Sequence, residues 1–71
     1  MHRYVILIEP TATGFSAYSP DLPGCVAAGS TRADVERNMH DAVELHLEGL
    51  RENGDPVPPP STFAAYVEVV A

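Results

Sequence analysis

The stretch that decides the fold is Ser30–Gly54, which reads STRADVERNMHDAVELHLEGLRENG. Thr31 is a suitable N-cap residue, and Asp34, three residues later, stands where a capping box has Glu or Gln. At the other end, Gly54 can adopt the left-handed conformation that ends a helix, and the prolines that follow prevent its continuation. The stretch therefore predicts a single helix that ends at about Asn53.

The predicted helix has one apolar face. At 100° per residue, its apolar residues share one arc, and most of its charged residues lie on the opposite arc. The apolar arc holds Val35, Met39, Ala42, Val43, His46, Leu47 and Leu50, and the charged arc holds Arg37, Asp41, Glu44, Glu48, Arg51 and Glu52. We expect the helix to cover a sheet with its apolar side.

Runs rich in β-branched and aromatic residues predict four strands, at residues 3–9, 15–19, 25–28 and 63–70. Turn residues join the first two strands as a hairpin, and the segment PDLPG separates the second from the third. The resulting β-β-β-α-β order places a right-handed helical crossover on one sheet face. The sequence thus predicts a single α+β domain over residues 1–71.

The first and last predicted strands are apolar on both faces. In the first strand, one face holds Tyr4, Ile6 and Ile8, and the other holds Val5 and Leu7. In the last strand, one face holds Val67 and Val69, and the other holds Tyr66 and Val70. An antiparallel sheet with one solvated face normally shows polar alternation there. We therefore expect the uncovered face or its edge to meet another chain, and 71 residues without a disulfide favour such assembly. The residues predicted at the oligomer interface are Val5, Leu7, Tyr66, Val70 and His46.

The net charge of -6 comes from ten acidic and four basic residues. This charge opposes contact with a phosphate backbone, so direct DNA binding is not expected. It would attract a basic protein, although acidity that merely keeps a small protein soluble explains the composition equally well. Because the sequence shows neither a signal peptide nor a membrane-spanning run, we expect a cytoplasmic protein without membrane contact.

Several motifs together carry a family resemblance. The chain contains YVILIE, then PDLPGC followed by a strand, then GST at the helix start, with Asn38, Ala42 and Leu45 on the helix. In this combination the chain resembles the HicB family of bacterial antitoxins over nearly its whole length.

The resemblance implies a truncated ribonuclease-H-like fold with sheet order 3-2-1-4, in which strand four is parallel to strand one. It also implies dimers or larger assemblies, and a partner, the HicA toxin, which is a small basic ribonuclease whose active site the antitoxin masks. Family members commonly carry a C-terminal DNA-binding domain. Since this sequence stops at Ala71, directly after the predicted strand four, autorepression is not expected of it.

Catalytic chemistry is not predicted, and neither is a metal or cofactor. Ribonuclease-H-like enzymes hold two metals through clustered carboxylates, whereas Glu9 and Glu68 alone could meet at the sheet rim. His46 points about 120° away from His40 on the helix, so one zinc ion cannot bind both. His46 is either an interface residue that titrates or a histidine at the edge of the core. Cys25 is expected to be a structural, buried residue.

The predicted partner-binding residues are Asp21, Leu22 and Pro23 in the PDLPG loop, with Glu9, Glu68 and the helix acids as secondary candidates. A proline-stiffened loop loses little entropy on docking, although an ordinary structural turn is an equally good interpretation. Asn38 is expected either to hold the backbone of this loop or to face solvent. Three functions remain open: an antitoxin that masks a HicA-type toxin, a homo-oligomeric regulatory or scaffold module, and a residual metal-dependent nuclease.

Overall fold

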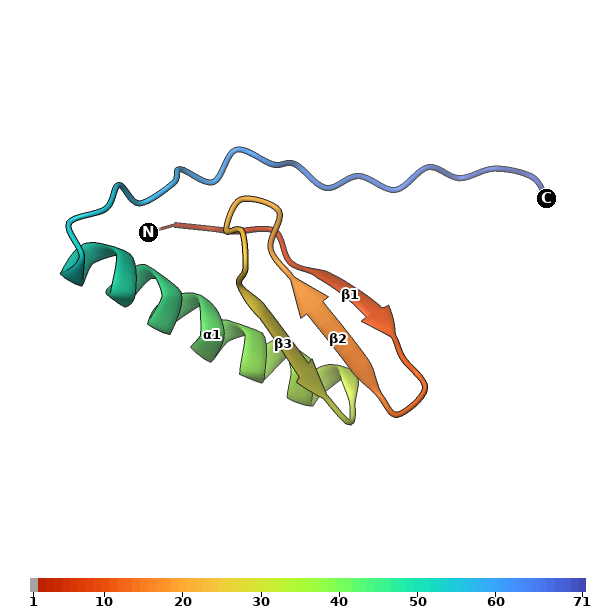
Figure 1. Ribbon diagram of the computed structural model, residues 1–71. Coiled ribbons are helices and arrows are strands. Elements are labelled where there is room, and N and C mark those ends of the chain that lie inside the picture. Colours follow the sequence, from red (N-terminus) through yellow and green to blue (C-terminus); the bar gives the residue numbers. More distant parts are fainter. Residues whose placement is uncertain (1) are drawn as a thin grey trace.

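The computed structural model describes residues 2–71 and shows three strands followed by one helix (Figure 1). The strands are β1 (Leu7–Pro10), β2 (Phe15–Tyr18) and β3 (Val26–Gly29), and the helix is α1 (Arg32–Glu52). The sheet is antiparallel with the order β1-β2-β3. The predicted α+β class and the three antiparallel strands are confirmed.

The hairpin between β1 and β2 closes where the turn residues predicted it. The Thr11 amide donates a 2.8 Å hydrogen bond to the Gly14 carbonyl. The register then pairs Leu7 with Tyr18, and Tyr18 with Val26 on β3. Because successive residues of a strand face opposite sides, this row lies on one face of the sheet.

Helix α1 begins and ends as its local sequence predicts. Thr31 is the N-cap with extended backbone, and its hydroxyl oxygen accepts a 3.1 Å hydrogen bond from the Asp34 amide. At the other end, Asn53 is the C-cap, and Gly54 follows with a φ of 71°. This left-handed conformation strains any residue with a Cβ, which explains the glycine there.

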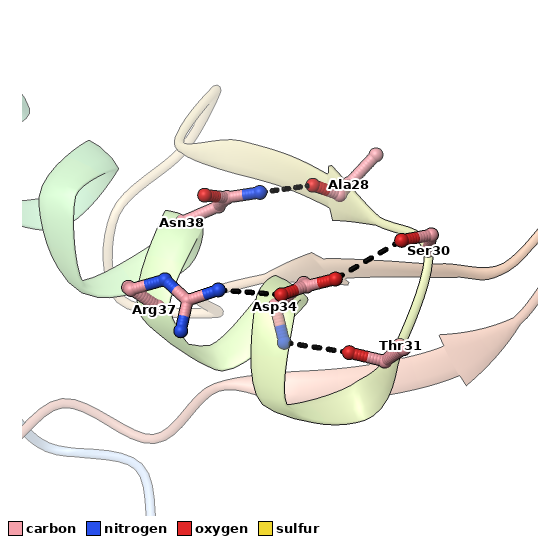
Figure 2. A network of polar contacts seen from close by, with 6 residues as sticks. All are labelled: Ala28, Ser30, Thr31, Asp34, Arg37 and Asn38. Carbon is pink, nitrogen blue, oxygen red and sulfur yellow. Dashed lines mark hydrogen bonds and ion pairs between the residues drawn. The ribbon is translucent and has the colours of Figure 1, made fainter.

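A polar network holds the start of α1 against the end of β3 (Figure 2). The Ser30 hydroxyl donates a 3.0 Å hydrogen bond to the Asp34 carboxylate, which also pairs with Arg37. One turn later, the Asn38 side-chain amide donates a 2.8 Å hydrogen bond to the Ala28 carbonyl. Of the two expectations for Asn38, the contact with the PDLPG loop is wrong: the amide holds β3 instead, because β3 lies alongside the first turns of the helix. The residue is exposed, as the other expectation has it.

The core lies between α1 and one face of the sheet, as the helical arc predicts. Its buried members come from β2, the PDLPG loop, the residue before β3 and the helix. They are Ala17, Leu22, Cys25, Val35, Met39 and Leu47. Tyr4, Ile6, Ile8 and three residues of the apolar arc, Ala42, Val43 and Leu50, are among those that pack around them. Cys25 is a free, buried thiol, and burial raises its pKa.

The prediction of a fourth strand and of a 3-2-1-4 sheet is wrong for this structure. Residues 63–70 are extended, yet they pair with no strand in the described part of the chain. In Figure 1 this blue segment runs past β1 in the direction of that strand and projects beyond the sheet. β1 is also shorter than predicted, because residues 3–6 lie outside the ladder. Strand composition signals that a segment fits a sheet, but pairing also needs a neighbour.

Candidate functional site

The proline-rich connector, residues 55–62, is fastened to the PDLPG loop by Asp21. Its carboxylate accepts hydrogen bonds from the backbone amides of Ser61 and Thr62, at 3.0 and 3.1 Å. The hydroxyls of the same two residues donate bonds of 3.1 and 2.7 Å to its other oxygen. The Tyr4 hydroxyl adds a hydrogen bond to the Pro58 carbonyl. The connector is thus held at two points.

These contacts place the three loop residues that the sequence nominated for partner binding. The hydrogen bonds, led by that from the Thr62 hydroxyl, hold the pKa of Asp21 below its usual value of 3.8. Leu22 is completely buried in the core, and Pro23 is exposed. Leu22 therefore shapes the loop from within, the half-buried Asp21 binds the connector, and Pro23 is the exposed residue of the three.

A groove runs along the free edge of β1 and is here called the edge groove. It encloses about 520 Å³. It is lined by Ile6, Leu7, Ile8, Glu9, Phe15, Tyr18, Arg32 and Tyr66. The structure thus brings together two residues predicted at an oligomer interface, Leu7 and Tyr66, from opposite ends of the chain.

The sheet face away from α1 carries an exposed apolar row. Leu7, Tyr18 and Val26 are cross-strand neighbours, and their exposed fractions are 39%, 41% and 65%. Val5, also predicted at an interface, is half-buried, and its carbonyl accepts a 2.9 Å hydrogen bond from Ser19. The row confirms that both faces of β1 are apolar, because Ile6 and Ile8 pack against the core on the other side.

A second groove of about 750 Å³ lies between α1 and the N-terminal residues and is here called the helix groove. Its apolar lining includes Ile6, Met39, Val43 and Leu47, and its charged and polar lining includes Glu36, Glu44, Glu48, His2, His40, Arg3 and Arg51. The sequence nominated the helix acids without ranking them. Apolar residues spaced three or four apart beside glutamates were the available signal, but locating the groove also requires the position of residues 2–6.

The remaining titratable residues that the sequence singles out are His40, His46, Glu9 and Glu68. His46 is half-buried on α1, and the structure leaves its interface role a prediction. His40, Asp41 and Glu44 place ligand atoms within 4.8 Å of one another, but all three are exposed, and exposed acidic groups commonly cluster without an ion. Among residues 2–71 this is the one group of three or more such ligands, and it includes neither Glu9 nor Glu68.

Comparisons with known proteins agree with this architecture. A family profile described as "HicB_like antitoxin of bacterial toxin-antitoxin system" matches residues 4–70. The chain is 33% identical over 70 residues to Antitoxin HicB 2 of Photorhabdus laumondii, covering 97% of this chain and 50% of that protein. It is 33% identical over 64 residues to an uncharacterized 14.9 kDa protein of Haemophilus phage HP1, covering 90% and 48%.

Among solved structures, one described as "HicA3 and HicB3 toxin-antitoxin complex" contains a chain that is 43% identical. It has a TM-score of 0.74, and the match covers 83% of this chain and 70% of that one.

These matches define the class of the chain: it has the domain that the HicB-like antitoxins of bacterial toxin–antitoxin systems share. The chain belongs to the HicB-like antitoxin family. It spans about half the length of the two curated relatives described above. In the part of the chain that the structure covers, no helix is long and apolar enough to cross a bilayer.

Proposed function

We propose that this protein binds a small basic toxin ribonuclease of the HicA type and covers its active site. The observation that carries the proposal is the fold likeness, at 43% identity, to a chain of a HicA3–HicB3 complex. Inhibition by covering needs contact area and no catalytic group. The cell compartment follows from the target, because a toxin that cleaves cellular RNA is blocked in the cytoplasm.

The helix groove is the surface that fits such a partner best. It combines an apolar floor with three carboxylates, and a protein interface typically has an apolar centre with a polar rim. Glu48 lies on this rim and takes part in no salt bridge among the described residues, so its charge is available to a cation. The overall charge of -6 attracts a basic protein, and the three glutamates of this rim outnumber its two arginines.

The PDLPG loop contributes a smaller contact in this proposal. Asp21 keeps its internal hydrogen bonds and Leu22 stays in the core, so Pro23 provides the exposed contact. Glu9 in β1 and Glu68 in the C-terminal segment are both exposed and add negative charge outside the loop. Their part in toxin binding remains a prediction.

Co-expression with a HicA-type toxin from the same genome tests the proposal. We expect the two proteins to co-purify and growth to be restored. The double variant Glu44→Arg and Glu48→Arg should weaken the complex by at least about tenfold, because it reverses two charges on the rim. Glu52→Arg is the matched control, since Glu52 is an exposed helix acid outside the groove lining. Absence of both a complex and rescue would remove the antitoxin function.

A further inference from the structure

The C-terminal segment, residues 63–70, has the exposure of an interface rather than of a solvated tail. Phe63, Tyr66 and Val67 are 95%, 98% and 84% exposed, and Val69 and Val70 are exposed as well. Contiguous apolar exposure of this density on a small protein marks a contact surface. The one charged residue within the segment is Glu68.

The segment is fixed at its base and unsupported along its length. Asp21 binds Ser61 and Thr62, but beyond Thr62 no hydrogen bond joins the segment to any residue from 2 to 71. The connector before it contains Pro56 and three consecutive prolines, which stiffen it. The base therefore sets the direction in which the segment leaves the domain.

The free edge of β1 offers unpaired backbone groups, with which the unpaired C-terminal segment could form hydrogen bonds. The hydrogen bond between Thr11 and Gly14 makes this pair a hydrogen-bonded pair of the hairpin. Hydrogen-bonded and non-hydrogen-bonded pairs alternate along an antiparallel ladder, so the pair of Ile8 is non-hydrogen-bonded. The backbone N–H and C=O of Ile8 therefore point away from β2, toward the free edge. Pro10 has no amide to donate, so it limits pairing at the far end. An edge with unpaired backbone groups is a template for an added strand.

The side chains of the two elements also match. β1 is apolar on both faces, with Ile8 toward the helix and Leu7 on the open face. The segment alternates Val67 and Val69 with Tyr66, Glu68 and Val70, so a strand added at this edge would place valines on one side and mainly apolar residues on the other. Such a strand would give these apolar side chains neighbours on both faces of β1.

We propose that two copies of this protein exchange their C-terminal segments, each segment pairing with the β1 edge of the other copy. The copy's own segment passes this edge, with Tyr66 lining the edge groove, yet it joins no strand there, and its connector is held by Asp21 and Tyr4. A second copy is not tied by that connector and can adjust its position. Reciprocal exchange around a two-fold axis occupies both edges and buries both segments at once.

The first test measures the mass of the full-length protein in solution, with no toxin present. We expect twice the 7.6 kDa of the chain for the native protein, and the single-chain mass for Val67→Asp. Val26→Asp is the matched control, because Val26 is also an exposed valine but lies on β3, away from the edge groove. A monomeric native protein, or a dimer that Val67→Asp leaves intact, would overturn the proposal.

The second test distinguishes exchange from pairing within one chain. In a Cys25→Ser background, one protein carries Leu7→Cys and another carries Tyr66→Cys, since both residues line the edge groove. After unfolding, mixing, refolding and mild oxidation, exchange predicts a disulfide-linked mixed dimer on a non-reducing gel. Each variant oxidised alone should give at least tenfold less linked dimer. No mixed dimer, together with intramolecular linkage in the Leu7→Cys and Tyr66→Cys double variant, would show pairing within the chain and contradict exchange.

Discussion

Gly29, the last residue of β3, illustrates how one missing side chain sets the distance between sheet and helix. A Cβ on Gly29 would lie 2.5 Å from the Val35 amide nitrogen and 2.9 Å from the Asp34 carbonyl carbon. Both neighbours are helix backbone and cannot rotate away. We expect Gly29→Ala to destabilise the fold by about 1–3 kcal/mol, the usual cost of overpacking, measured by urea denaturation.

Gly49 provides the matched control for this substitution. It lies inside α1, and a Cβ there would meet nothing within 4 Å. Gly49→Ala should therefore stabilise the protein by up to about 1 kcal/mol through helix propensity. If both substitutions changed the unfolding free energy in the same direction, steric contact at Gly29 would not be the cause.

At the same scale, Asp21 makes the connector sensitive to acid. Because the folded protein lowers the pKa of this carboxyl, its hydrogen bonds are fully formed above the unfolded pKa and are lost as the pH falls through the folded pKa. An NMR titration should give a midpoint below 3.8. Thr62→Val removes the hydroxyl whose hydrogen bond lowers the pKa of Asp21 most, so it should raise the midpoint. Ser16→Ala, at a site remote from Asp21, should leave the midpoint unchanged. A midpoint that Thr62→Val does not alter would contradict this account.

At the scale of the element, the N-cap of α1 is a local determinant of stability. The Thr31 hydroxyl satisfies an amide of the first turn that would otherwise lack an acceptor. Thr31→Ala should lower the free energy of unfolding by about 1 kcal/mol, and Thr31→Ser, which keeps the hydroxyl, should lower it by much less. Thermal unfolding of the two variants checks the prediction, and equal losses would show that the hydroxyl is not responsible.

The elements differ in how far the sequence predicts them. Helix α1 was predicted at both ends because the determinants, Thr31 and Gly54, act on the backbone within a few residues. β2 and β3 were predicted to within a residue, since turn residues bound them. The C-terminal segment has the composition of a strand and is not one here, because a strand depends on a partner that composition cannot name.

The candidate site shows the same division. Pattern predicted that Leu7 and Tyr66 belong to an interface, and the structure places both in the edge groove. The sequence pattern could not predict that Asp21 binds Ser61 and Thr62, because that contact spans about forty residues and depends on the path of the connector. The helix groove likewise needs residues distant in sequence, Ile6 and Met39, to lie together.

At the scale of the whole molecule, the two proposed roles use two different surfaces: the helix groove for toxin binding, and the edge groove with the C-terminal segment for self-association. The lining of the helix groove contains three glutamates and two arginines, whereas the edge groove has only Glu9 and Arg32, and the C-terminal segment has only Glu68. A domain of this size has a small core, so burial of the segment in a dimer would add stability that the single chain lacks. Toxin binding and self-association can then occur on the same molecule without competing for one surface.

This division predicts opposite responses to salt. Raising NaCl from about 0.1 to 1 M shortens the Debye length from about 10 to 3 Å and screens attraction between exposed charges. The association rate with a basic toxin should then fall by at least about tenfold, as stopped-flow mixing can measure, because that rate depends on electrostatic steering. The dimer mass should stay unchanged, since apolar contacts are not screened. The double variant Glu44→Arg and Glu48→Arg should show a weaker salt dependence of the rate. If the dimer dissociated at high salt and the association rate with the toxin did not change, both assignments would be wrong: the charged helix groove to the toxin, and the C-terminal segment to the dimer.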